Sequence, residues 1–552
     1  MESETRNCKY CKTQFEITER EMSMYEKINL MIPDICVPCR WKQHMAFWPF
    51  GKFRTGVSDL SGERLITVLP ANARYPIYTS KEWWSDAWDA MTHGQDYDSS
   101  RSFFDQLKEL QEKVPRPHQQ GAQSLNCDWC DDAWESKNCY LSRSTLRAEN
   151  LFYGYRSIDC KDSIDVSHVF TLDQCYDCTY CFTSYNLFFS KNCRDCLDSA
   201  FLFDCRNSNH CFMCWNLRGK SYCIENVQYT KEAYEEKMKE INFGSNIELQ
   251  KYKDRYEEIL RKNVVHRENF NIKTYDSLGT YMTNCKNCVN VFSWEDSENC
   301  TNCLRGLKSK DSIDMVGCWN MELSGNDSCC TNAYDLKYSI WCDGARYSEY
   351  CDQCVEIENC FGCVSLRKKK YCILNKQYSK EEYEVLKEKI ISDMKERGEY
   401  GQFPPYSMGL CPYNFSTSAI YSPDVTKEYV EALRGYWEDN KDEKIEGLTT
   451  EQIPDSITEV DESFSKQALI CPITGWRYNI AEGELAFLKR KNISIPRVHF
   501  DVRTKNRLSI LSQTKSEAYT CTYCSKNIIA YYPKDWGYEY IACEHCYLKE
   551  IA

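Results

Sequence analysis

The chain is 552 residues long, with 42% hydrophobic and 14% aromatic residues and a formal net charge of −13. A single hydrophobic core does not grow to this length, so we expect about three or four domains. The apolar content excludes a wholly disordered protein. The acidic balance argues against a protein that coats nucleic acid over its whole surface.

The cysteine content sets the expected compartment. The chain has 36 cysteines, and its first residues, MESETRNCKYC, contain no apolar stretch typical of a secretory signal. No window approaches the ~18 consecutive apolar residues of a membrane span. We therefore expect a cytoplasmic protein without membrane contact, whose thiols stay free or bind metal in a reducing compartment. A secreted protein linked by disulfides is the alternative.

A four-cysteine zinc module is predicted near the start of the chain. Between its cysteines, Phe15 and Ile17 alternate as in a short strand, and Thr18 with Glu21 forms a capping box that predicts a helix through Tyr25. Zinc prefers four soft ligands in a tetrahedron, and each C-x-x-C pair places two thiolates on one side of it. The predicted ligands are Cys8, Cys11, Cys36 and Cys39.

The pattern C-x-x-C, Phe, Ile-Thr, Glu, Tyr, Pro, C-x-x-C-Arg over residues 6–45 resembles the probable zinc-ribbon (treble-clef) domain family. More broadly, the chain resembles long uncharacterised cysteine-rich proteins of uncultivated small-genome bacteria and some giant viruses. The resemblance implies a zinc-binding treble clef in a cytosolic protein. It implies no mechanism, because no activity is established for that family.

A second zinc module is predicted near the end of the chain. Apolar and aromatic residues between Ile528 and Ile541 are typical of a hairpin, and two C-x-x-C pairs joined by strands are the layout of a zinc ribbon. Its predicted ligands are Cys521, Cys524, Cys543 and Cys546. With the first module, this predicts about two Zn²⁺ per chain as the cofactor content.

Residues 469–508 are predicted to be a degenerate copy of the first module. An offset of 463 positions aligns Cys8 with Cys471 and Arg40 with Arg503, and it keeps the apolar frame between them. We expect this copy to keep its fold and to bind no zinc, because the other three ligand positions hold Thr474, His499 and Val502.

The middle of the chain contains an internal duplication with an offset of 149 residues. Residues 211–241 match residues 360–390, and the motif KDSID occurs at 161–165 and again at 310–314. The offset holds without a gap over about a hundred residues, which indicates two copies of one structural unit.

Each copy is predicted to be a β-solenoid. Runs such as NLFYGY and SAFLFDC alternate polar and apolar residues between Asn, Asp, Ser and Cys, which is typical of short strands with tight turns. Cysteines recur at intervals near 20 in the first copy, and coils of that length would stack them in a ladder. A capping box at Ser379 and Glu382 predicts a helix that covers the end of its copy, with a counterpart near Thr230.

Three interpretations of the 26 cysteines from Cys127 to Cys372 stay open. The first is a stacked interior of free thiols, which behave as small hydrophobic groups. The second is a set of further zinc knuckles, and the third is iron–sulfur ligation. The best-spaced candidates for an additional zinc site are Cys285, Cys288, Cys300 and Cys303.

Basic residues concentrate between Leu485 and Lys515, where only Asp501 opposes them, and a weaker group lies beside aromatic residues after the first module. Such groups attract phosphate backbones. The candidate nucleic-acid contacts are Arg40, Arg497, Arg503 and Arg507. A solvated or intramolecular charged surface is the alternative.

No catalytic residue is predicted. The sequence lacks a P-loop, a G-x-S-x-G motif and an H-E-x-x-H motif. The expected fold is mainly β with α: a duplicated, cysteine-rich β-solenoid flanked by small zinc-binding treble-clef and ribbon modules. We expect a zinc-binding intracellular scaffold with a protein partner. The alternatives are a nucleic-acid or ribonucleoprotein-associated binder and an enzyme with a site in the solenoid groove.

The predicted domain boundaries follow chain order. The segments are a zinc module (1–45), an aromatic-rich α/β linker domain (46–125), the first solenoid copy with its capping helix (126–241), a helical connector (242–283), the second solenoid copy with its capping helix (284–392), a linker with an acidic arm (393–468), the degenerate copy (469–508) and a zinc ribbon (509–552).

Overall fold

The structure is a computed structural model that describes residues 3–439, 446–509 and 516–551. The chain forms two compact units, and each is assembled from two separate stretches of sequence. Unit 1 comprises residues 1–119 and 269–439, and unit 2 comprises residues 120–268 and 440–552. The predicted segments therefore do not pack in chain order, because the N-terminal module shares a unit with the second solenoid copy.

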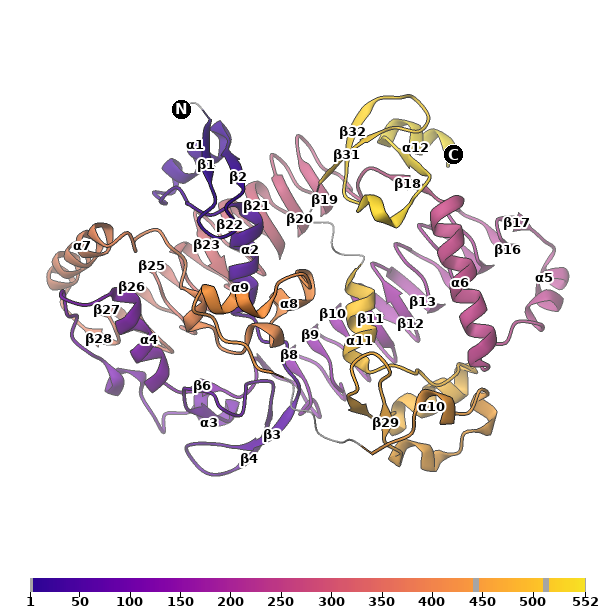
Figure 1. Ribbon diagram of the computed structural model, residues 1–552, viewed down its shortest axis with the longest axis horizontal. Coiled ribbons are helices and arrows are strands. Elements are labelled where there is room, and N and C mark those ends of the chain that lie inside the picture. Colours follow the sequence, from indigo (N-terminus) through magenta and orange to yellow (C-terminus); the bar gives the residue numbers. More distant parts are fainter. Residues whose placement is uncertain (1–2, 440–445, 510–515, 552) are drawn as a thin grey trace. The chain divides into compact units, whose positions relative to one another are not determined.

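Unit 2 is built on the first solenoid, a parallel stack in chain order that ends in one antiparallel strand (Figure 1). Its strands are β7 (Gly121–Ala122), β8 (Asp131–Trp134), β9 (Arg143–Leu146), β10 (Tyr155–Ile158), β11 (Ile164–Asp173), β12 (Tyr176–Thr179), β13 (Phe182–Phe188), β14 (Leu197–Ala200), β15 (Asn209–Phe212), β16 (Ser221–Ile224) and β17 (Val227–Gln228).

Unit 1 is built on the second solenoid, which repeats this arrangement. Its strands are β19 (Leu278–Thr283), β20 (Val289–Glu295), β21 (Glu298–Leu307), β22 (Lys310–Val316), β23 (Gly325–Ser328), β24 (Tyr334–Lys337), β25 (Arg346–Glu349), β26 (Glu358–Phe361), β27 (Lys370–Ile373) and β28 (Lys376–Gln377). The expected class, mainly β with α and a duplicated solenoid, is confirmed.

One solenoid coil takes 12 residues, as the hydrogen bond from Asn138 Nδ2 to Asn150 Oδ1 across adjacent coils shows. Within a coil the backbone turns at every third residue, where φ is positive, as at Asn138 (φ 55), Leu141 (φ 46) and Ser144 (φ 54). Asn and Asp tolerate this left-handed conformation better than other side chains, which explains their frequency. The predicted interval near 20 is wrong, because it joined cysteines that lie on different sides of the coil.

The residue after each corner faces the solenoid interior, and cysteine occupies many of these positions. Cys318, Cys330 and Cys342 lie one coil apart, and none is more than 1% exposed. The Cys181 Sγ–H group lies 3.5 Å from the Thr179 carbonyl oxygen and 3.4 Å from that of Ser190. Serine donates from the same kind of position, as Ser190 Oγ does to the Phe188 carbonyl at 2.8 Å.

These contacts support the stacked-thiol interpretation of the middle cysteines. Each small side chain fills one layer of the interior and satisfies its donor on the backbone. Among the described residues, cysteines close enough in groups of three or more to share a metal occur only in the two terminal modules. The proposed extra zinc set lies in the solenoid interior instead: Cys285, Cys288, Cys300 and Cys303.

Helices follow each solenoid, as predicted. In unit 2, α5 (Lys231–Met238) packs Tyr234 against Tyr222 at a ring separation of 5.7 Å. In unit 1, α7 (Lys380–Glu396) starts at the Ser379 capping box and packs Tyr383 against Tyr371 at 5.8 Å. These two ring pairs are equivalent under the offset of 149.

A second helix packs along the side of each solenoid. In unit 2, α6 (Asn246–Lys262) donates from Tyr256 Oη to the Leu202 carbonyl at 2.7 Å. In unit 1, α4 (Phe103–Lys113) packs Phe103 against Phe361 at a ring separation of 5.2 Å. Short connecting helices, α8 (Thr417–Tyr421) and α9 (Lys427–Ala432), complete unit 1.

Candidate metal centres

The N-terminal module contains the first four-cysteine cluster. It consists of β1 (Glu4–Asn7), β2 (Gln14–Ile17), α1 (Glu19–Lys27) and α2 (Val37–Ala46). The predicted capping box of Thr18 and Glu21 starts α1. Cys8 and Cys11 lie in the turn between the two strands, while Cys36 caps α2 and Cys39 lies in its first turn. The four Sγ atoms lie within 4.8 Å of one another.

The C-terminal module contains the second cluster. It consists of β31 (Glu517–Thr520), β32 (Asn527–Ala530), β33 (Tyr540–Ala542) and α12 (Glu544–Glu550). Here too, the first cysteine pair lies in a hairpin turn and the second pair begins a helix. The Sγ atoms of Cys521, Cys524, Cys543 and Cys546 also lie within 4.8 Å of one another.

Each cluster fits one tetrahedrally coordinated metal ion. A Zn–S bond of about 2.3 Å places tetrahedral sulfur atoms about 3.8 Å apart. The Cys11–Cys36 and Cys524–Cys543 Sγ separations are 3.6 and 3.8 Å, far longer than a disulfide of about 2.05 Å. Four cysteines fill the coordination sphere, so each site suits a closed, structural metal.

The backbone prepares the sulfur atoms for metal binding. The Cys36 N–H group donates to Cys8 Sγ at 3.3 Å, and the Cys543 N–H group donates to Cys521 Sγ at 3.4 Å. Burial acts to raise the pKa of the Cys521 thiol, but backbone N–H groups of Cys543 and Cys524 overcome it and lower that pKa to about 6. Metal ligation requires the thiolate, so these donors favour the binding form.

The N-terminal module is attached to the second solenoid through a buried ion pair. Arg40, on α2, lies 2.9 Å from an Asp314 carboxylate oxygen and is 3% exposed. Tyr25 Oη donates to the other Asp314 oxygen at 2.6 Å, and Glu21 accepts from Asn302 Nδ2 at 2.7 Å. Burial raises the pKa of Asp314, although the neighbouring Arg40 acts to lower it. A buried carboxylate destabilises the fold unless it is paired and hydrogen-bonded, so Asp314 requires both Arg40 and Tyr25.

The predicted degenerate copy forms the same elements as the N-terminal module. Its strands β29 (Leu469–Ile470) and β30 (Arg477–Tyr478) precede α10 (Glu482–Lys491) and α11 (Phe500–Ser509). Adding 463 to the bounds of α2 gives those of α11. The knuckle turn is also kept, since the Cys8 N–H group donates to Thr13 O at 2.8 Å and the Cys471 N–H group donates to Trp476 O at 2.9 Å.

The degenerate copy is attached to the first solenoid by equivalent residues. Arg503 lies 2.8 Å from Asp165 and 2.8 Å from Glu484. Arg40 and Arg503 differ by the module offset of 463, while Asp314 and Asp165 differ by the solenoid offset of 149. The repeated KDSID motif thus contains the docking carboxylate of each unit, a role that its repetition alone did not reveal.

A neighbouring pair also corresponds between the units. In unit 1, His44 Nε2 lies 2.7 Å from Asn326 Oδ1. In unit 2, the equivalent residues are Arg507 and Asp177, 3.8 Å apart, and Arg507 also lies 2.9 Å from Asp165. A neutral hydrogen bond in one unit is therefore an ionic contact in the other.

The proposed nucleic-acid contacts do not form an exposed basic surface. Arg40, Arg503 and Arg507 are 3%, 9% and 5% exposed and face solenoid carboxylates. Arg497 donates to the carbonyls of Ile453 and Pro454 at 3.1 and 2.9 Å. The sequence showed the positive charges, but their partners lie far away in the chain. Of the two interpretations offered for them, the intramolecular charged surface is the one that these contacts match.

His499 lies inside the degenerate copy. It is 6% exposed, its Nδ1 accepts from the Asp501 N–H group at 3.1 Å, and its ring packs against Phe500 at 4.1 Å. Cys471 is the only cysteine at the four ligand positions of this copy. The donor set therefore does not match the closed four-cysteine sites.

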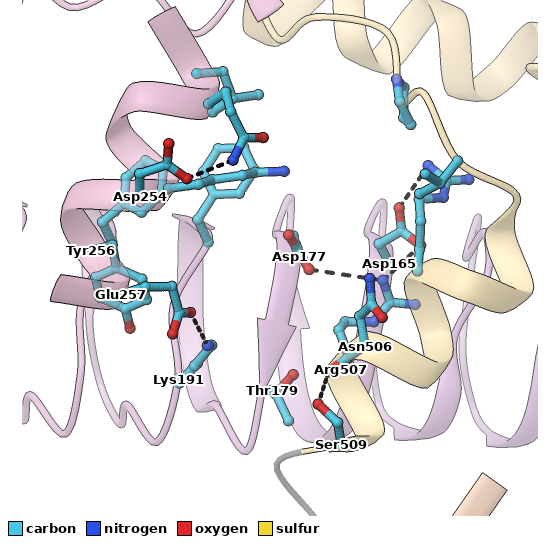
Figure 2. Close-up of a pocket in the computed structure, with 18 of the residues that line it drawn as sticks. Asp165, Asp177, Thr179, Lys191, Asp254, Tyr256, Glu257, Asn506, Arg507 and Ser509 are labelled. Atoms are coloured by element: carbon cyan, nitrogen blue, oxygen red, sulfur yellow. Dashed lines mark hydrogen bonds and ion pairs between the residues drawn. The ribbon is translucent and has the colours of Figure 1, made fainter. Parts of the chain in front are cut away.

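A pocket of about 710 Å³ opens on unit 2, between the first solenoid, α6 and α11. Figure 2 shows that its walls contain paired charges, with Lys191 3.0 Å from Glu257 and Arg507 3.8 Å from Asp177. The described residues that line it include neither Cys nor His.

No family model matches this chain, and no curated protein matches it. Within the described parts of the chain, no helix has both the length and the apolar character needed to cross a membrane.

Proposed function

We propose that the chain is a zinc-binding scaffold, in which the small modules fix helices onto two solenoids whose coils present a partner-binding surface. One observation supports this most directly: the conspicuous arginines of the modules are used in buried ion pairs with solenoid carboxylates. These arginines therefore attach the modules to the solenoids, which favours a structural role over binding of a charged ligand. Solenoid coils offer extended surfaces that suit protein partners.

The proposed metal is Zn²⁺, with a structural role. Four thiolates at tetrahedral spacing select a soft ion, and a closed set leaves no position for a substrate or water. The zinc-ribbon likeness of residues 6–45 supports the same assignment. The cysteines of the described chain form no disulfide, which suits a reducing compartment such as the cytoplasm.

Metal analysis of the purified chain tests the first part of the proposal. We expect about two zinc ions per chain, one for each cluster. Replacement of Cys543 by Ser should remove one of them, while replacement of the interior Cys330 by Ser should remove none. Retention of both ions by Cys543→Ser would contradict the assignment.

A pull-down from native cells, with and without nuclease, tests the scaffold itself. We expect partners that survive nuclease treatment, together with no binding of labelled RNA or DNA by fluorescence anisotropy at low salt. Partners that all disappear with nuclease, or nucleic-acid binding that weakens steeply with salt, would favour the ribonucleoprotein alternative.

A further inference from the structure

Residues 54–84 of unit 1 have the backbone of the C-terminal module. Strands β3 (Arg54–Val57) and β4 (Arg64–Thr67) form a hairpin in which Arg54 pairs with Thr67. In the C-terminal module, β31 and β32 pair Glu517 with Ala530. Arg54 differs from Glu517 by 463 positions, and Thr67 differs from Ala530 by the same number. This is the offset that relates the N-terminal module to its degenerate copy.

The correspondence continues beyond the hairpin. Strand β5 (Ile77–Tyr78) pairs in parallel with β6 (Arg116–Pro117), with Ile77 opposite Arg116. Strand β33 pairs in parallel with β18 (Val265–Arg267), with Tyr540 opposite Val265. Strands β5 and β33 are related by the module offset of 463, and their partners β6 and β18 are related by the solenoid offset of 149. Helix α3 (Ser80–Trp84) then occupies the place where α12 begins.

The turn that forms a zinc knuckle is also present without its cysteines. The Ser58 N–H group donates to Glu63 O at 2.8 Å, as the Cys521 N–H group does to Lys526 O at 2.8 Å. Gly62 has φ 76, and its counterpart Ser525 has φ 60. The backbone of a metal knuckle is therefore kept where no thiol remains.

We infer that residues 54–84 are a zinc module that has lost its metal, and that the Glu82 carboxylate links its two halves in place of the ion. The four positions that hold cysteines in the C-terminal module hold Ser58, Ser61, Ser80 and Trp83 here. Glu82 precedes the fourth position and corresponds to His545.

The contacts of Glu82 join the same two elements that a metal would join. Its Oε2 atom accepts from Ser58 Oγ, in the knuckle turn, at 2.5 Å. It also accepts from the Thr79 N–H group at 2.8 Å and from Thr79 Oγ1 at 3.0 Å, at the start of α3. A carboxylate accepts several hydrogen bonds at once, so it can hold several donors around one point.

The surroundings of Glu82 suit a carboxylate. Burial acts to raise the pKa of Glu82, but hydrogen bonds from Ser58, Ser61 and Thr79 overcome it and lower the pKa to about 2. Trp83 is fully buried at the fourth ligand position and donates from Nε1 to the Pro115 carbonyl at 3.1 Å. The indole thus fills volume next to the former site and fixes α3 to β6.

The two units have therefore lost opposite sites. Unit 1 keeps the four cysteines of the N-terminal module and has none at the equivalent positions of residues 54–84. Unit 2 keeps only Cys471 of the first set and all four cysteines of the second. Each unit has two modules and one metal site. The chain is therefore a duplication of a unit that has two modules and one solenoid. The N-terminal modules share a unit with the second solenoid and the C-terminal modules with the first, and each unit has lost one of its two metal sites.

Loss of the Glu82 carboxylate is the first test. In Glu82→Ala, we expect amide hydrogen exchange across β3 to β5 to become about tenfold faster or more, because Ser58 and Thr79 lose their common acceptor. The zinc content should stay at two per chain. Glu63→Ala, in the same hairpin and exposed, should change neither quantity. Equal exchange in both variants would overturn the role of Glu82.

A graft into the C-terminal module is the second test. Cys521→Ser, Cys524→Ser and Cys543→Ser with Cys546→Ala should lower the zinc content from two to one and expose the amides of β31 to β33. Addition of His545→Glu should restore much of that amide protection without restoring zinc. No difference between the variants with and without His545→Glu would count against a carboxylate link.

Restoration of the ligands is the third test. Ser58→Cys, Ser61→Cys, Ser80→Cys and Trp83→Cys together should bind a third metal ion, with the thiolate-to-metal absorption of Co²⁺ as the probe. A variant that keeps native exchange in the second solenoid yet binds only two ions would overturn the origin proposed for residues 54–84. Because removal of Trp83 leaves a cavity, a triple variant that retains Trp83 should also gain Co²⁺ absorption.

Discussion

The N-terminal module in unit 1 and the degenerate copy in unit 2 dock onto equivalent solenoids, but of these two modules only the N-terminal one has a four-cysteine cluster. Arg40 and Asp314 in unit 1 occupy the places of Arg503 and Asp165 in unit 2. The docking geometry persists in the degenerate copy, which lacks three of four cysteines. The comparison separates two features of the N-terminal module: the four-cysteine cluster, which the degenerate copy lacks, and the ion pair with the solenoid, which the degenerate copy keeps.

Removal of the metal ion from the N-terminal module should have the largest effect on the difference between the two modules. We expect Cys36→Ser to lower the zinc content from two to one and to expose the amides of β1, β2 and the start of α2. Metal binding supplies about 10 kcal/mol or more of folding energy in small zinc peptides. Zinc analysis and hydrogen exchange measure both effects.

Cys471→Ser is the matched control for this prediction, because Cys471 takes the place of Cys8 in the degenerate copy. It should leave the zinc content unchanged. A loss of zinc in Cys471→Ser would show that the degenerate copy still participates in metal binding.

Removal of a docking arginine should have the next largest effect. Arg503→Met leaves Asp165 and Glu484 buried without their shared cation, and Arg40→Met does the same to Asp314. We expect each to destabilise its own unit by about 3–5 kcal/mol. Hydrogen exchange of α11 and of α2, respectively, measures the opening free energy.

Arg147→Met tests whether this cost depends on burial. Arg147 pairs with Asp159 on an exposed solenoid corner, with both side chains more than 40% exposed. We expect a change below about 1 kcal/mol. Similar losses for Arg147 and Arg503 would mean that burial of the docking pairs contributes little.

The His44–Asn326 pair predicts a difference in acid sensitivity between the units. Burial lowers the pKa of His44 to about 3, whereas an unfolded histidine titrates near 6.5. As the pH falls from about 6.5 towards 3, the unfolded state binds a proton that the folded state does not, so stability falls. Above about 6.5 this contribution is constant.

His44→Gln should remove that component of the acid sensitivity of α2. The position equivalent to His44 in unit 2 is Arg507, so that unit has no histidine at this place. Hydrogen exchange of α2, compared between the parent and His44→Gln at each pH, isolates this contribution from the protonation of metal ligands. Identical pH profiles would contradict it.

The smallest effect should come from the solenoid interior. Cys330→Ser keeps a donor of similar size where serine already occurs in other coils, so we expect a loss below about 1.5 kcal/mol. Cys330→Leu adds volume between Cys318 and Cys342 and should cost about 1–3 kcal/mol. Denaturant unfolding measures both, and a larger loss in the serine variant would show that the thiol itself is required.

Local patterns predicted the two four-cysteine clusters and the capping boxes, because these signals lie within a few residues of one another. Thr18 with Glu21 and Ser379 with Glu382 start helices as expected. The solenoid coil length was missed because cysteine is only one of several residues that fill the interior. Asn and Asp at many of the third positions were the better signal, since these residues tolerate the positive φ that each corner has.

The assembly of the units was beyond reach for a different reason. Arg40 and Asp314 lie 274 residues apart, and nothing in the local sequence pairs them. The offset of 463 was recognised only as far as Arg40 and Arg503, although it continues to Trp83 and Cys546. Serines at the ligand positions hide the relation in the sequence, although the backbone keeps the turn.

The exchanged order of modules and solenoids has a consequence for synthesis. When a ribosome has produced the N-terminal module, Asp314 is still 274 residues away from Arg40. The first solenoid appears next, but it belongs with residues that come later still. Until its partner is synthesised, Arg40 of the N-terminal module has no docking carboxylate, and Asp165 of the first solenoid has no docking arginine. During that interval, an ion bound by Cys8, Cys11, Cys36 and Cys39 would join the two cysteine pairs of the N-terminal module without any contact from the solenoid.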